Sequence, residues 1–98
     1  MAKEVKDRGQ SIIDALKLAT LVPLAVAEMS AEVAAVLESL KPITSINMAS
    51  DIGVGSGLAE AARKGALANV EINLEGLKDP AYVAQMRSKV DELRKRLG

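Results

Sequence analysis

The stretch that decides the fold is residues 47–79, which read NMASDIGVGSGLAEAARKGALANVEINLEGLKD. Interpreted as a helix that begins at Asp51, it has a small or polar residue at every fourth position. These residues are Gly53, Gly57, Ala61, Gly65, Asn69 and Asn73. At about 100° per residue the row winds slowly across the helix, and the polar residues collect on one solvent-facing side. That polar side consists of Ser56, Glu60, Arg63, Lys64, Glu71 and Glu75.

In this arrangement Asn69 and Asn73 are predicted to point away from water. A buried amide without hydrogen-bond partners costs about 1 to 3 kcal/mol, so both must be paired with protein, water or a ligand. Two interpretations remain open. The amides line a ligand site, or they bond one another or a facing backbone across an interface, as buried asparagines do when they fix register.

Residues 3–40 are predicted to form one long helix. Apolar residues recur every seven places in two registers, which makes a continuous seam. The seam consists of Ile12, Ala19, Val26, Val33 and Leu40 with Ala15, Val22, Met29 and Val36. Pro23 lies inside the helix and predicts a kink near residues 19–23 without a break, because the seam resumes in register. Glu28 and Glu32, one turn apart on the polar side, form a solvated pair unless Glu28 contributes to a site.

Residues 41–47, KPITSIN, are predicted to be a connecting loop, since Pro42 disfavours helical geometry at Lys41. Ser50 or Asp51 then caps the second helix. Alternatively, both lie at the mouth of a cleft, where a helix N-terminus can also hold an anion.

Gly76 is predicted to end the second helix, and Asp79 followed by Pro80 signals the cap and first position of a third. That helix is expected to run to about Leu97. Its apolar stripe consists of Tyr82, Met86, Val90, Leu93 and Leu97.

The glycines at 53, 55 and 57 do not form a nucleotide-binding loop. Their spacing is not G-x-G-x-x-G, no strand precedes them, and no G-K-S/T follows. Each glycine costs a helix about 1 kcal/mol relative to alanine, so three of them indicate a packing or binding requirement.

Composition favours an all-α protein. The chain has 98 residues, of which 49% are hydrophobic and only Tyr82 is aromatic. This hydrophobic content is too large for one thin layer of helices to bury, so a partner is expected. A formal net charge of zero gives no field that would attract nucleic acid.

The absence of cysteine and histidine argues against zinc, disulfides and thiolate or imidazole chemistry, and no metal is expected. Charged residues precede any apolar run at the N-terminus, so no signal peptide is predicted. The apolar residues 18–27 are too few to cross a bilayer, which needs about 20. A cytoplasmic protein without membrane contact is therefore expected.

The chain resembles the distal half of the formimidoyltetrahydrofolate cyclodeaminase and methenyltetrahydrofolate cyclohydrolase family. The resemblance includes VPLAVAE at residues 22–28 and covers nearly the whole chain, 1–98, as one helical domain. In residues 47–79 the matching positions are Asn47, Ser50, Asp51, Gly53, Val54, Gly65, Ala66, Asn69, Val70, Ile72, Asn73, Leu74, Lys78 and Asp79. The family's proximal half, with its glycine-rich segment and its acidic proton acceptor, has no counterpart here.

The resemblance implies a tetrahydrofolate derivative as substrate. The chain would close formimidoyltetrahydrofolate to the methenyl form with loss of ammonia, or open the methenyl ring with water. Asn69 and Asn73 would orient or polarise the substrate, and Asn47, Ser50 and Asp51 would line the entrance. No proton acceptor is identified among these residues.

We therefore expect a three-helix antiparallel bundle fragment with a proline-kinked first helix, which assembles into a larger helical bundle. The partner is a second copy or a separate proximal-half chain. The alternative function is a non-catalytic helical assembly domain, or a relic half of such an enzyme.

Overall fold

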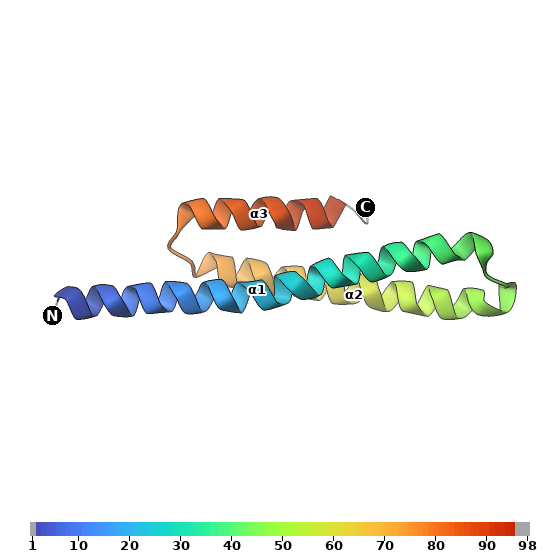
Figure 1. Ribbon diagram of the computed structural model, residues 1–98, viewed down its shortest axis with the longest axis horizontal. Coiled ribbons are helices and arrows are strands. Elements are labelled where there is room, and N and C mark those ends of the chain that lie inside the picture. Colours follow the sequence, from blue (N-terminus) through green and yellow to red (C-terminus); the bar gives the residue numbers. More distant parts are fainter. Residues whose placement is uncertain (1, 96–98) are drawn as a thin grey trace.

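The computed structural model describes residues 2–95 and contains helices without strands in that range. The order is α1 (Ala2–Leu40), the 3-10 turn η1 (Lys41–Ile43), α2 (Ile46–Glu75) and α3 (Pro80–Lys95). Figure 1 shows α1 and α2 as a long antiparallel hairpin, with α3 folded back along one side of it. The result is a rod of 68 × 18 × 15 Å. The expected all-α architecture of three antiparallel helices is confirmed.

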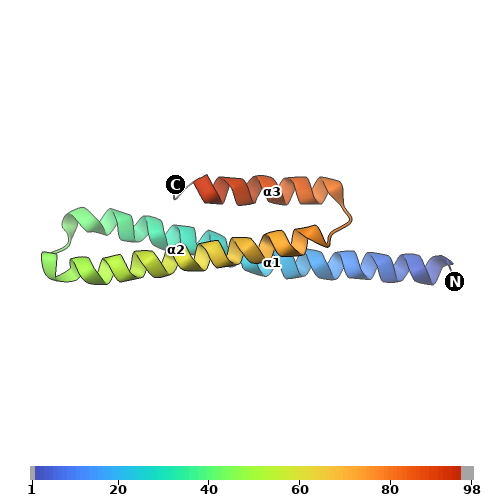
Figure 2. The same cartoon turned by 180° about the vertical axis from the view of Figure 1, so that it is seen from behind.

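Helix α1 runs without interruption through Pro23. In Figures 1 and 2 its direction changes gently about halfway along, where the colour passes from blue to cyan. The proline therefore bends the helix and does not end it, as the continuous apolar pattern predicts.

The hydrophobic core lies where all three helices meet. Three of its members are alanines, Ala27 and Ala31 of α1 and Ala66 of α2, which let the helices approach closely. The core consists of Leu24, Ala27, Ala31, Ala66, Leu67, Val70, Leu74, Leu77, Met86, Val90 and Leu93. The predicted stripe of α3 is confirmed at Met86, Val90 and Leu93, and Tyr82 packs against the same cluster. Leu97 lies outside the described residues.

The seven-residue seam of α1 is not buried against α2. Its members Val22 and Met29 are 68% and 64% exposed, whereas Thr20, Leu24 and Ala27 on a neighbouring side of the helix are buried. Alanines and hydroxyls on that side allow α2 to come close. The hydroxyl of Thr20 donates to the carbonyl of Leu16 at 2.7 Å, which satisfies it within the helix. The seam is thus real as a sequence pattern, but its large side chains stay mostly exposed along the edge of the contact with α2.

The predicted start of the second helix is wrong. Helix α2 begins at Ile46, with Ser45 in extended geometry as the N-cap, and no side chain supplies a capping hydrogen bond. Ser50 and Asp51 therefore lie inside the helix and cap nothing. The reason is that Pro42 restricts only the residue before it, while nothing from Ile46 onward prevents helical geometry.

The expected end of α2 and start of α3 are confirmed. Gly76 is the C-cap of α2, and Pro80 is the first residue of α3. The Asp79 carboxylate accepts a hydrogen bond from the backbone N–H of Tyr82 at 3.2 Å. This is an N-cap, which satisfies one of the free N–H groups of the first turn.

The predicted solvent-facing side of α2 is wrong at two positions. Arg63 is only 4% exposed, and Ser56 is half-buried with its hydroxyl enclosed. The Arg63 guanidinium donates to the carbonyls of Leu93 and Arg94 at 2.8 and 3.3 Å. Since α3 folds over this side of α2, Arg63 caps the end of α3 instead of facing water.

The length of the first helix is relevant to the expectation that the chain does not contact a membrane. The helical span Lys3–Ile43, which is α1 with the following 3-10 turn, is long and apolar enough, by length and composition, to cross a membrane, although residues 18–27 alone are too short. Core helices of other proteins pass the same test.

Candidate functional site

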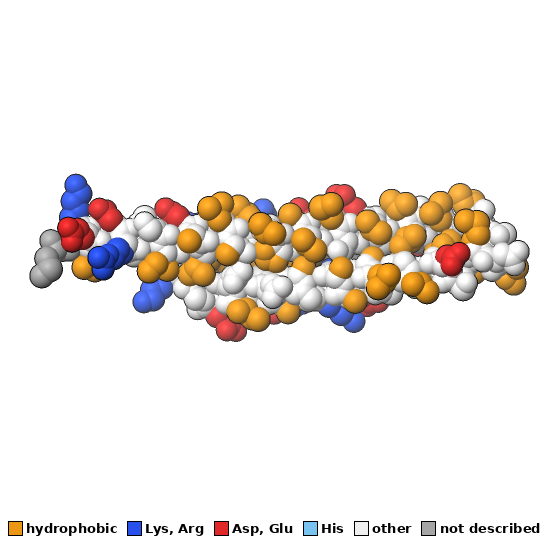
Figure 3. Space-filling model, turned by 90° about the horizontal axis from the view of Figure 1, so that it is seen from below, with side chains coloured by type: hydrophobic (Ala, Val, Ile, Leu, Met, Phe, Trp, Pro, Cys, Tyr) orange, Lys and Arg blue, Asp and Glu red, His pale blue; other side chains and the backbone are white. Residues whose placement is uncertain are grey.

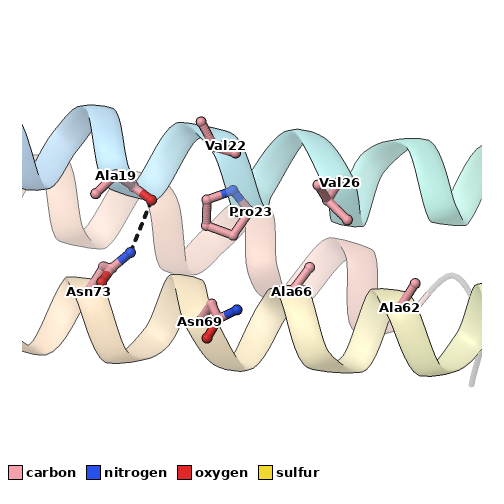
Figure 4. A pocket seen from close by; sticks show the side chains of 8 residues that line it. All are labelled: Ala19, Val22, Pro23, Val26, Ala62, Ala66, Asn69 and Asn73. Carbon is pink, nitrogen blue, oxygen red and sulfur yellow. Dashed lines mark hydrogen bonds between the residues drawn. The ribbon is translucent and has the colours of Figure 1, made fainter.

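A groove opens between α1 and α2 at the level of Pro23. It has a volume of about 450 Å³. Small apolar side chains form most of its wall, and two amides lie toward one end (Figure 4). The lining residues are Ala19, Val22, Pro23, Val26, Ala62, Ala66, Asn69 and Asn73.

Asn73 compensates for the proline. Pro23 has no N–H, so the carbonyl of Ala19 loses the helical donor four residues along the chain. The side-chain N–H of Asn73 donates to this carbonyl at 3.0 Å (Figure 4). An amide from α2 thereby replaces the missing backbone bond of α1. For Asn73, this is the facing-backbone arrangement that the sequence left open.

Asn69 lies one turn before Asn73 on the same wall of the groove. It is exposed, and its amide has no hydrogen-bond partner among the described residues. The expectation that both asparagines point away from water is wrong for Asn69, and Asn73 is only half-buried. The cause is that nothing in the described chain covers this side of the hairpin.

The entrance residues Asn47, Ser50 and Asp51 are all exposed near the start of α2. At 1.5 Å per residue, Asp51 lies about 27 Å along the helix from Asn69. The structure therefore does not bring the two predicted groups together around one point. A separation of 18 residues makes five full turns, so both groups face the same side of α2.

A second groove of about 560 Å³ continues between the helices toward the η1 end. It shares Val26 with the first and is almost entirely apolar. The other lining residues are Met29, Ser30, Val33, Leu37, Gly55, Leu58 and Ala59. Together the two grooves form an elongated furrow along the hairpin.

This hairpin carries the features of a known family. The profile described as formiminotransferase-cyclodeaminase matches residues 1–92. The chain belongs to that family. The motif residues quoted above all lie within the matched range. Three of them, Ala66, Asn69 and Asn73, line the first groove, and Lys78 and Asp79 lie in the turn into α3.

Two curated proteins are similar to this member of the formiminotransferase-cyclodeaminase family, at modest sequence identity. A formimidoyltransferase-cyclodeaminase of Sus scrofa is 35% identical over 91 residues, which are 92% of this chain and 17% of the relative. A methenyltetrahydrofolate cyclohydrolase of Methylorubrum extorquens is 34% identical over 91 residues, 93% of this chain and 44% of the relative. The chain thus spans less than half the length of either. No solved structure matches it.

The lining of the furrow contains no ionisable side chain. Glu28 instead lines a separate hollow between α1 and α3, together with Glu32, Lys89 and Glu92. Both Glu28 and Glu32 are exposed, as a solvated pair would be. Among residues 2–95 no group of three or more acidic, histidine or cysteine side chains could hold a metal.

Sequence reasoning missed the cluster where α1 meets the start of α3. The Lys17 ammonium lies 2.8 Å from the Asp79 carboxylate and 4.7 Å from the centroid of the Tyr82 ring. The hydrogen bond to Lys17, with that from the Tyr82 N–H, holds the pKa of Asp79 below its ordinary value. The hydrogen bond to Asp79 raises the pKa of Lys17. This cluster attaches α3 to the hairpin and lies apart from the furrow lining.

Proposed function

We propose that the furrow between α1 and α2 binds a reduced folate as part of a cyclodeaminase or methenyltetrahydrofolate cyclohydrolase site. The observation that carries the proposal is the pair of amides, Asn69 and Asn73, on the wall of an apolar groove. Membership of the formiminotransferase-cyclodeaminase family and the activities for which the two relatives are named support this substrate class.

The amides suit the edge of a pterin ring, which presents N–H donors and carbonyl and ring-nitrogen acceptors. Because the N–H of Asn73 is used by the Ala19 carbonyl, its own carbonyl oxygen is oriented and keeps its acceptor capacity. The amide of Asn69 can both donate and accept. The apolar side chains of Val26, Ala62 and Ala66 suit contact with the faces of the ring.

The elongated shape of the furrow supports the same ligand class. A folate has a pterin at one end, a benzoyl group in the middle and a glutamate at the other. With the pterin against the amides, the benzoyl group would follow the apolar second groove. The glutamate would then point toward the N-terminal turns of α2, whose free N–H groups favour an anion.

Both reactions pass through a tetrahedral carbon between two folate nitrogens, so each requires proton transfer. Neither groove is lined by an acid or base. In this proposal the chain holds and orients the folate, and a second polypeptide supplies the proton acceptor. That polypeptide is another copy or a separate proximal-half chain.

One observation favours the alternative, a helical assembly domain without catalysis. The Asn73 donor already bonds to protein, so this residue has a structural role without any ligand. Asn69 has no such partner in residues 2–95 and therefore distinguishes the two functions.

Calorimetric titration with a reduced folate tests the proposal. Asn69→Leu should abolish most of the binding while leaving the melting temperature nearly unchanged, since the amide is exposed and unbonded. Gln85→Leu, the same change of amide to leucine on the exposed side of α3, serves as the control and should bind like the parent. A parent that binds no reduced folate, alone or with a complementary chain, would reject the folate site and leave the assembly domain. Assays with formimidoyltetrahydrofolate and methenyltetrahydrofolate then distinguish the two reactions.

A further inference from the structure

The backbone carbonyl of Ala19 is a hydrogen-bond acceptor at one end of the groove between α1 and α2. Pro23 has no N–H to bond it within the helix, and the Asn73 side chain donates to it instead at 3.0 Å. This bond is exposed, and Ala19 lines the groove. Since a carbonyl oxygen has two lone pairs, the second remains available to a ligand in the groove.

The same bond fixes the orientation of the Asn73 amide. The Ala19 oxygen can only accept, so the amide must direct its nitrogen there, as Figure 4 shows. The side-chain oxygen of Asn73 is then held away from Ala19 and keeps its capacity to accept. Two neighbouring acceptors, one from each helix, therefore occupy this end of the groove.

Asn69 adds a donor one helical turn along the groove. Its amide has no hydrogen-bond partner among residues 2–95, so its N–H group is free to donate. The groove opens on the side of the hairpin away from α3. Figure 3 shows that side, where charged side chains lie mainly at the edges and near the N-terminal end. A ligand in the groove therefore meets an acceptor, an acceptor and a donor, in that order, beside apolar side chains.

The edge of a reduced pterin presents the complementary order of groups. Its 2-amino group and the neighbouring N3–H are donors, and the 4-carbonyl beside them is an acceptor. We propose that the Ala19 carbonyl accepts from the 2-amino group, the Asn73 carbonyl accepts from N3–H, and the Asn69 amide donates to the 4-carbonyl. This inference rests on the folate site proposed above and adds a recognition group from α1. Pro23 is then a specificity-determining residue, because it frees the carbonyl that binds the 2-amino group.

A proline that only bends the helix would have a different consequence. Proline is the least favourable residue inside a helix, so replacing it would then stabilise α1 without affecting which of two ligands binds. A site built around a hydrogen bond instead rejects an analogue that lacks the bonded group, because its own polar group is left unpaired. Selectivity for the 2-amino group therefore separates recognition from bending.

Calorimetric titration of the full chain, alone and with a complementary chain, tests this selectivity. The ligands are tetrahydrofolate and the analogue that carries a methyl group in place of the 2-amino group. The parent should bind tetrahydrofolate about tenfold more tightly, which is the effect of one hydrogen bond. In Pro23→Ala the N–H of residue 23 bonds the Ala19 carbonyl, so the preference should fall to about twofold or less. Loss of the proline ring affects both ligands alike and leaves their ratio unchanged.

Pro42→Ala is the matched control. It makes the same change in the exposed turn between α1 and α2, outside the lining of both grooves, and should keep the parent's preference. The parent also provides a measurement that does not depend on how Pro23→Ala folds. The NMR signal of its Ala19 carbonyl carbon should move when tetrahydrofolate binds, and move much less with the analogue.

The outcomes separate this inference from the folate site on which it rests. A parent that binds both ligands equally, or a Pro23→Ala variant that retains the preference, overturns the role of Ala19 and leaves the folate site standing. An Ala19 carbonyl signal that stays in place with bound tetrahydrofolate does the same. A parent that binds neither ligand rejects the folate site itself, and this inference with it.

Discussion

Asn73 on α2 supplies the hydrogen-bond donor that Pro23 removes from α1. The bond joins the Asn73 amide nitrogen to the Ala19 carbonyl oxygen at 3.0 Å, between the two helices of the hairpin. A proline in the middle of a helix is tolerated when another group pairs with the carbonyl it leaves free. The register of α2 against α1 is thereby tied to the bend in α1.

A double-mutant cycle between Pro23 and Asn73 tests this dependence. Asn73→Ala should lower the free energy of unfolding by about 0.5 to 1.5 kcal/mol in the parent, because the Ala19 carbonyl loses its donor. In a Pro23→Ala background the backbone N–H of residue 23 can bond that carbonyl, so the same change should cost close to nothing. Urea denaturation of all four proteins gives the coupling. Equal costs in the two backgrounds would show that the residues act independently, and Asn69→Ala provides the uncoupled control.

The buried Arg63 is predicted to hold α3 on the hairpin. Arg63→Met keeps much of the side-chain volume but removes the donors to the Leu93 and Arg94 carbonyls. We expect a loss of about 2 to 3 kcal/mol, since hydrogen bonds from a charged group are stronger than neutral ones. The loss should be accompanied by faster hydrogen exchange in α3 than in the middle of α2.

Lys64→Met is the matched control for Arg63. Lys64 is exposed and pairs only with Glu60 at 3.2 Å, a surface contact of small value. Lys64→Met should change the free energy of unfolding by no more than about 0.5 kcal/mol. Similar losses in the two variants would contradict the capping role of Arg63.

Local chemistry made the helix ends near Gly76 and Pro80 predictable. The Asp79 cap and the proline act within one turn, and no distant residue is needed to define them. The apolar pattern of α1 was also visible. It could not reveal which side faces α2, because a heptad repeat describes an interface without identifying the helix that covers it. The structure buries the side with Ala27 and Ala31 instead.

The features that the sequence did not predict depend on contacts between residues far apart in the chain. The burial of Arg63 depends on where α3 folds back, about 30 residues along the chain. For Asn73 a signal was present, since any proline inside a helix frees the carbonyl four residues earlier. Its partner could be found only once α1 and α2 were placed in register. Asn69, on the groove beside it, was already a candidate from the four-residue row of small and polar residues, but its predicted burial was wrong.

The contact between Lys17 and Asp79 predicts acid sensitivity with a defined sign. The folded-state pKa of Asp79 lies below its ordinary value of 3.8. Its stabilising contribution is therefore fully present above that value and is lost as the pH falls through the lower folded pKa. The pKa of Lys17 is raised above 10.5, so this pair should contribute no pH dependence between pH 6 and 9.

Acid titration of the melting temperature checks this expectation. Asp79→Asn can still cap α3 but cannot ionise, so it should reduce the loss of stability below about pH 4. Added salt should weaken the effect, because both groups of the pair are accessible to solvent. A parent and variant with identical profiles below pH 4 would show that the contact is too weak in solution to matter.

The glycines of α2 give the last prediction, which concerns the free space beside the helix backbone. A Cβ added at Gly57 or Gly65 meets nothing within 4 Å in the single chain, whereas at Gly55 it lies 3.2 Å from a methyl carbon of Leu37. Gly57→Ala should therefore stabilise the protein by about 1 kcal/mol, and Gly55→Ala by less.

Gly65 and Gly57 form a matched pair, because both are exposed and lie on different sides of α2. Gly65→Ala should give the same gain of about 1 kcal/mol as Gly57→Ala, since neither added methyl group meets another part of the described chain. Urea denaturation of the three alanine variants and the parent measures the gains. A gain at Gly55 equal to the other two would show that the Leu37 side chain moves aside without cost.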